Sequence, residues 1–127
     1  MNKDLQNSVH EASPHELIRM LFDGALDHLA GVKLAIESDD NALRDKNLNA
    51  VSAIIDGLQS SLDAQQGGEL AENLYALYSY MHRRLTDCAS ENSVGIVIEV
   101  GDLMHTLKEA WAAIDPRCQE IRPPILA

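Results

Sequence analysis

The side chains most able to do chemistry in this chain are its five histidines: His10, His15, His28, His82 and His105. No two of them are four residues apart, the spacing that places two histidine ligands on one helical face. A di-iron helical bundle needs two Glu-x-x-His units, and the nearest approach here is a single Asp102-x-x-His105. We interpret that pair as part of a solvated helix face. The sequence therefore predicts no metal site and no cofactor.

His82 is the strongest candidate for catalysis because two arginines follow it directly. Histidine phosphotransfer modules are small four-helix bundles that present one exposed histidine, and Arg83 and Arg84 could meet a phosphate there. The residues after His82 nevertheless lack the Lys-Gly pattern of such modules. No phosphate-binding glycine loop with its Lys-Ser/Thr and no nucleophile elbow is found. We expect a protein that is not an enzyme, with phosphotransfer through His82 as an alternative.

The charge and the apolar content of the chain narrow the class of partner. The 127 residues include 10 basic and 20 acidic side chains, and the net charge of −10 repels phosphate backbones and anionic lipids. There is no run of 18 apolar residues, and the first residues lack the apolar core of a signal peptide. We expect a cytoplasmic protein that binds no nucleic acid and does not insert into membranes, with Cys88 and Cys118 as thiols.

Four segments have the start and stop signals of helices. Ser13, followed by proline, predicts a helix over residues 13–37. The paired glycines at 67–68 predict a reversal between a helix over 42–64 and one over 69–88. Ser93 is the predicted N-cap of the last helix, which should end near Asp115-Pro116 because proline disfavours a helical residue before it.

Each segment carries apolar residues at steps of three and four, the spacing of a helix that buries one side. The predicted buried positions are Ile18, Phe22, Ala25, Leu29, Val32 and Ile36; then Leu48, Val51, Ile55, Leu58 and Leu62; then Leu70, Leu74, Leu77, Met81, Leu85 and Cys88; and finally Val97, Val100, Met104, Leu107, Trp111 and Ile114. We therefore predict an all-α fold, an antiparallel up-down-up-down four-helix bundle over residues 13–115. Residues 1–12 are predicted to be a loosely attached, flexible N-terminal arm, and residues 116–127 an irregular C-terminal tail.

Small and aromatic residues remain after the buried positions are assigned. Rows of small residues lie beside those positions on the first two helices, including Gly24, Gly31 and Gly57, although glycine costs about 1 kcal/mol against alanine inside a helix. Such rows either let neighbouring helices approach closely or form an external groove for a partner segment. The three tyrosines, Tyr75, Tyr78 and Tyr80, fall outside the predicted buried positions. We interpret them either as interface residues or as half-buried residues at the bundle edge.

Four blocks of the chain form a pattern: ASPHELIRMLFDGA over 12–25; IIDGL and SLD over 54–63; GGELAENL, LYSYM and RRL over 67–85; and Glu-Val at 99–100 followed by Leu107 and Ala110-Trp111. These blocks resemble the FliS family of flagellar secretion chaperones. The blocks occur in the family's order across about residues 9–114, and the one over 67–85 is the most specific. The resemblance implies an antiparallel helical bundle without catalytic activity.

The resemblance also implies the partner. It implies a cytoplasmic chaperone that binds the disordered C-terminal segment of flagellin in surface grooves, prevents premature polymerisation and delivers it to the flagellar type III export gate. We expect a monomer in a 1:1 complex, with a dimer as an alternative, and distributed apolar contacts that offset the ordering of the partner. A self-associating structural bundle is the other alternative. The expected partner-binding residues are Leu17, Met20, Gly24, Ala53, Gly57, Tyr75 and Tyr78.

The chain departs from the family pattern in its N-terminal arm. Family members commonly have a tyrosine there that covers a groove in the absence of flagellin, and residues 1–12 contain no tyrosine. We expect Leu5 or Val9 to take its place, so that the arm shields an apolar groove until the client displaces it. The turn over 88–93 is also more polar than the family's usual turn.

Overall fold

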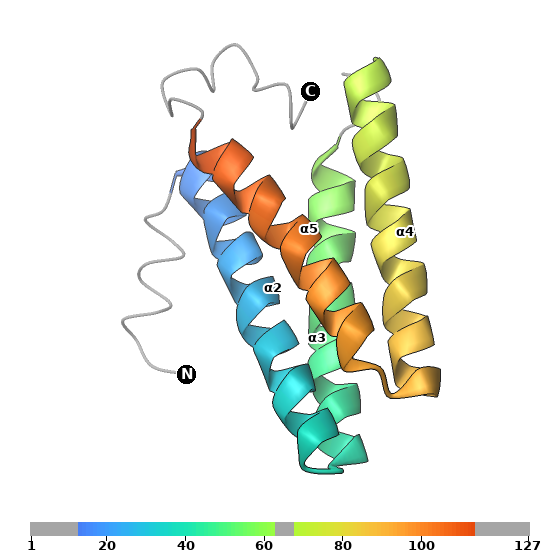
Figure 1. Ribbon diagram of the computed structural model, residues 1–127. Coiled ribbons are helices and arrows are strands. Elements are labelled where there is room, and N and C mark those ends of the chain that lie inside the picture. Colours follow the sequence, from blue (N-terminus) through green and yellow to red (C-terminus); the bar gives the residue numbers. More distant parts are fainter. Residues whose placement is uncertain (1–12, 63–67, 114–127) are drawn as a thin grey trace.

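The computed structural model describes residues 13–62 and 68–113, and within these ranges the chain forms four helices. They are α2 (Pro14–Glu37), α3 (Asn41–Ser61), α4 (Glu69–Glu91) and α5 (Val94–Ala112). The predicted all-α four-helix fold is confirmed, and Figure 1 shows each helix running opposite to the one before it. The predicted arm, with Leu5 and Val9, the predicted tail, with Cys118, and Ile114 at the predicted end of the last helix lie outside the described residues.

Helices α2, α3 and α5 begin where a side chain caps them, whereas α4 begins after Gly68 without a side-chain cap. The backbone N–H of Glu16 donates to Ser13 Oγ at 3.2 Å, and that of Ile96 donates to Ser93 Oγ at 3.2 Å, which confirms both predicted caps. Asp40 caps α3 in the same way by accepting from the N–H of Leu43 at 3.0 Å. The end predicted for the first helix is confirmed at Glu37, whereas α4 continues three residues beyond the predicted 88.

The core lies between all four helices, and each helix packs against two neighbours. α2 contacts α3 and α5, and α4 contacts the same two helices from the opposite corner. The α2–α3 pairing is the most extensive, and the two pairings of α4 are the least extensive. The predicted buried positions of α3 are all confirmed, and so are those of α2 and α5, apart from the partly buried Ile36 and the undescribed Ile114.

The buried side of α4 differs from the prediction in its N-terminal half. Leu70 is 46% exposed and Leu77 is only partly buried, whereas Ala71 and Tyr78 are buried. Either pair of residues continues the spacing of buried positions, because 70, 74, 77 and 81 and also 71, 74, 78 and 81 recur at steps of three and four. Hydrophobicity favoured the leucines, but the orientation of α4 is decided by its C-terminal half, where Leu85 and other predicted residues pack into the core. No helix in the described ranges is long and apolar enough to cross a membrane.

Candidate functional site

The α2–α3 pair holds five of the seven residues expected to bind a partner. An added Cβ at Gly24 would lie 3.4 Å from Ile54 Cδ1 on α3, and one at Gly57 would lie 4.0 Å from Leu21 Cδ1 on α2. These two contacts place both glycines where the two helices meet. Leu17, one turn before Leu21, is 36% exposed. We call this surface the α2–α3 face and define it as Leu17, Met20, Leu21, Gly24, Ala53, Ile54 and Gly57.

The α2–α3 face is shallow because its exposed positions carry little side chain. Ala53 and Gly57 are exposed, and Met20 and Gly24 are half-buried beside them. The backbone of a partner segment could therefore come close to both helices, with Leu17 and Met20 offering the larger apolar surfaces. The structure brings these five predicted residues together on one pair of helices.

The other interpretation of the small residues, close approach of helices, holds for Gly31. An added Cβ at this position would lie 2.8 Å from Asn47 Oδ1 and 2.9 Å from its Nδ2. The amide of Asn47 is fixed in that place, because Oδ1 lies 2.9 Å from His28 Nδ1 and Nδ2 donates to the carbonyl of Leu43 at 3.0 Å. Gly31 therefore makes room for a polar contact that sets how α3 lies along α2.

The three tyrosines of α4 have three different environments. Tyr75 is 55% exposed, so it is accessible, but it lies on α4 and not on the α2–α3 face. The prediction that Tyr78 is accessible to a partner is wrong: it is 2% exposed and belongs to the core, where burial raises its pKa to about 12. The error follows from the wrong choice of buried side for α4. The hydroxyl of Tyr80 donates to Glu99 Oε2 at 2.5 Å.

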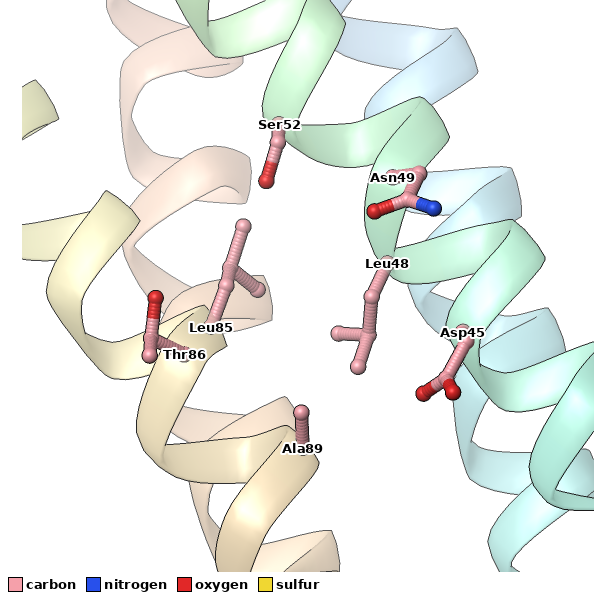
Figure 2. Close-up of a pocket in the computed structure, with 7 residues that line it drawn as sticks. All are labelled: Asp45, Leu48, Asn49, Ser52, Leu85, Thr86 and Ala89. Atoms are coloured by element: carbon pink, nitrogen blue, oxygen red, sulfur yellow. The ribbon is translucent and has the colours of Figure 1, made fainter.

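A pocket between α3 and α4 was not predicted from the sequence. Leu48 and Leu85 are buried at its base, and Figure 2 shows them on facing helices with side chains directed into the space between. The other residues that line it are Asp45, Asn49, Ser52, Thr86 and Ala89. The polar residues of α3 recur at steps of four and three, a signal that identifies one side of that helix but not what faces it.

Polar contacts also join α4 to α3 along the line where these two helices meet. Gln59 Nε2 donates to the carbonyl of Tyr75 at 3.0 Å and to Ser79 Oγ at 2.8 Å. His82 Nε2 lies 2.8 Å from Asp56 Oδ1, but it is poorly aligned for a hydrogen bond and is shielded from solvent. Because Nε2 of His82 is shielded, the structure gives no support to phosphotransfer through that ring nitrogen.

On its other side, α4 is attached to α5 through a single carboxylate. Glu99 accepts from Tyr80 and from Arg84 Nε at 2.7 Å, and Arg84 Nη1 also donates to Asp87 at 3.0 Å. The hydrogen bond from Tyr80, followed by that from Arg84, lowers the pKa of Glu99 below its usual 4.5. Arg83 lies 5.7 Å from the centre of the Tyr80 ring. These hydrogen bonds fix how α4 and α5 align along their lengths at Glu99.

His15 and Trp111 join the ends of α2 and α5. Their rings stack with centroids 4.8 Å apart, Trp111 Nε1 donates to the carbonyl of His15 at 2.8 Å, and His15 Nε2 lies 3.1 Å from the carbonyl of Trp111. His105, considered above with Asp102, instead lies 2.9 Å from Glu109 Oε1 on the exposed side of α5.

Comparison with known proteins supports the resemblance noted in the sequence. A family model described as "Flagellar protein FliS" matches residues 1–118. The flagellar secretion chaperone FliS of Salmonella typhimurium is 41% identical over 114 residues, covering 89% of this chain and 84% of that protein. FliSB of Pseudomonas aeruginosa is 36% identical (87% of each chain), and FliS of Bacillus subtilis is 36% identical (84% and 78%). The chain therefore belongs to the FliS family, a family of flagellar secretion chaperones and not of enzymes.

Proposed function

We propose that this protein is a cytoplasmic chaperone that binds the disordered C-terminal segment of flagellin, prevents premature polymerisation and delivers it to the flagellar type III export gate. Membership of the FliS family supports the chaperone role. The observation that carries the choice of site is the exposure of the α2–α3 face on the most extensively packed pair of helices. A client can bind there without separating the bundle.

The chemistry of the α2–α3 face suits a chain that folds as it binds. Ordering such a segment costs about 2 to 5 kcal/mol or more, so no single contact can carry the binding. An amphipathic helix would lay its apolar side on Leu17 and Met20 and bring its backbone close to Gly24, Ala53 and Gly57. Tyr75 is a separate accessible contact on α4 for the same client. Tyr78 has no part in this proposal because it is buried.

Size-exclusion chromatography of the protein mixed with flagellin tests the proposal directly. We expect a 1:1 complex with full-length flagellin and none with flagellin that lacks its C-terminal segment. If both forms of flagellin elute with the chaperone, the proposed client segment is wrong. Oligomers of the chaperone without a client would instead favour the self-associating bundle.

A pair of matched variants tests the site. Ala53 on the α2–α3 face and Ala30 on another side of α2 are both exposed alanines within helices. Ala53→Glu should weaken flagellin binding by roughly tenfold or more because a charge then meets an apolar contact. Ala30→Glu should leave binding unchanged. Equal effects of the two substitutions in isothermal titration calorimetry would exclude the α2–α3 face.

The N-terminal arm is proposed to cover an apolar surface until flagellin displaces it, with Leu5 and Val9 as its contacts. Deletion of residues 2–11 should then increase the fluorescence of an apolar dye or tighten the binding of flagellin. If neither quantity changes, the arm does not shield the site. Delivery to the export gate is tested separately, by asking whether the complex, but not the free chaperone, is retained by an immobilised gate component.

A further inference from the structure

Hydrogen bonds join α4 to α5 at Glu99, but among the described residues none joins the two helices nearer the N-terminus of α4. Glu99, in the second turn of α5, binds Tyr80 and Arg84 in the middle and the C-terminal half of α4. Among the described residues, no hydrogen bond or ion pair joins α4 to α5 between Tyr80 and the N-terminus of α4. The two helices are also the least extensively packed of the neighbouring pairs. In the described residues, the N-terminal half of α4 is therefore bonded to α3 through Gln59 but lacks the polar attachment to α5 that the C-terminal half has.

Apolar side chains remain accessible along that open half. Because the helices run in opposite directions and Arg84 meets Glu99, Leu77 lies near the level of Leu103, and Leu70 near that of Ala110. Leu70 is 46% exposed, Ala110 is exposed, and the other two are partly buried. We call these four residues the open α4–α5 face.

The chain itself supplies a segment at the right end of the bundle. In Figure 1 the C-terminus of α5 and the N-terminus of α4 lie at the same end, and 14 residues follow Ala113. A segment of that length spans up to about 46 Å when extended, whereas neighbouring helix axes are about 10 Å apart. A segment of that length is therefore long enough to span the distance to the open α4–α5 face.

The composition of the C-terminal residues complements this face. The sequence from 121 to 126 is Ile-Arg-Pro-Pro-Ile-Leu, so three large aliphatic side chains surround two prolines. Prolines restrict the unbound segment to extended conformations, which lowers the entropy that docking would cost. The two arginines after position 113 balance Asp115 and Glu120, so the side chains of the segment carry no net charge in a chain of charge −10 and are not repelled by Glu69 and Glu72 in the first turn of α4.

We propose that residues 119–127 pack back onto the open α4–α5 face and complete the bundle at the N-terminal half of α4. The FliS family model ends at residue 118, so this addition lies outside the part of the chain that matches the family. The occupant is a segment of the same chain, and flagellin has no part in it. Its success or failure is therefore independent of the proposed client site.

Disulfide trapping tests this packing in the full chain. Cys118 lies next to the segment, and Asn73 is exposed on the side of α4 that faces α5. In Asn73→Cys, mild oxidation should form an intramolecular disulfide with Cys118 roughly tenfold faster than in Ala53→Cys, where the new thiol is on the α2–α3 face. Cys88 is fully buried and serves as an unreactive internal thiol.

Two results would overturn the proposal. One is an equal rate of disulfide formation in the two variants. The other is a disulfide-linked dimer in place of the intramolecular product, which would make a second copy the occupant. Replacing the aliphatic residues (Ile121→Ser, Ile125→Ser and Leu126→Ser) in the Asn73→Cys chain should reduce its rate to that of the control.

Hydrogen exchange gives a second measurement without new thiols. A chain truncated after Cys118 should show several-fold faster amide exchange over residues 70–77, because the docked segment no longer protects the first turns of α4. Exchange in the middle of α3 should not change and serves as the control. If residues 70–77 exchange at the same rate in both chains, the segment does not pack there.

Discussion

Different contacts hold the two helices together in the α2–α3 pair and in the α4–α5 pair. In the first, glycines let the helices approach, and Asn47 fits against Gly31. In the second, one carboxylate, Glu99, binds two side chains of α4 and leaves a leucine at the end of that helix exposed. Small residues leave Ala53 and Gly57 exposed beside α2 in the first pair, whereas in the described residues of the second pair hydrogen bonds join the helices through Glu99. Client binding is therefore proposed on the first pair, and docking of the chain's own segment on the second.

The largest effect is expected where the two pairs meet, at Trp111. This side chain is fully buried, stacks on His15 and donates to its carbonyl. Trp111→Ala should lower the free energy of unfolding by about 3 to 5 kcal/mol because it leaves a large cavity. Urea denaturation followed by circular dichroism measures this change, and Trp111→Phe should lose less. A loss below about 1 kcal/mol in the alanine variant would show that this contact does not join the pairs.

A smaller effect is expected at alkaline pH from Tyr78. Its folded-state pKa is raised to about 12 by burial, from an ordinary 10.0, so its contribution to stability is present below pH 10 and is lost as the pH rises from 10 to about 12. Over that range the protein should lose on the order of 2 kcal/mol relative to Tyr78→Phe. Absorbance at alkaline pH should show a tyrosine titrating near pH 12 that is missing in the variant. If Tyr78→Phe removes an early-titrating group instead, Tyr78 is not in the core.

A substitution of glycine by alanine compares the packing of the two pairs. Gly31→Ala should destabilise the protein by about 1 to 2 kcal/mol, because the added methyl group displaces the Asn47 amide from its hydrogen bonds. Gly101→Ala on α5 is the matched control, because an added Cβ there meets nothing within 4 Å. It should be neutral or stabilising by up to about 1 kcal/mol through helix propensity. Equal changes in the two midpoints of urea unfolding would contradict the close approach at Gly31.

The smallest effect is expected from the hydrogen bonds of Glu99 with Tyr80 and Arg84 on the surface of the α4–α5 pair. Glu99→Gln removes the carboxylate that binds Tyr80 and Arg84, so the variant should be modestly less stable at neutral pH. The pKa of Glu99 is lowered in the folded protein, so its contribution is present above the usual 4.5 and is lost as the pH falls through the lower folded-state value. Thermal unfolding of both proteins as a function of pH should therefore converge in acid. A difference that persists in acid would mean that the glutamine disturbs packing and that lost charge is not the cause.

Several parts of the candidate site could be predicted from the sequence because they depend on local spacing. Leu17, Met20 and Gly24 share one side of α2, and Ala53 and Gly57 lie on the outer side of α3, as helical periodicity requires. That Gly24 and Gly57 lie where the two helices meet depends on how those helices pack. The pocket between α3 and α4 also depends on helix packing, because Asp45 on α3 and Thr86 on α4 come together only when the two helices pack.

The sequence alone determined the four helices of the described ranges, the caps at Ser13 and Ser93, and the buried sides of α2, α3 and α5, because these follow from interactions within about four residues of the chain. Only the tertiary structure decided which side of α4 is buried. Leu70 and Tyr78 could each have faced the core or the solvent by spacing alone, and the contacts of α4 with α3 and α5 selected Tyr78. The physical reason is that a helix turns as a rigid unit, so contacts at its better-packed end orient every side chain along its length.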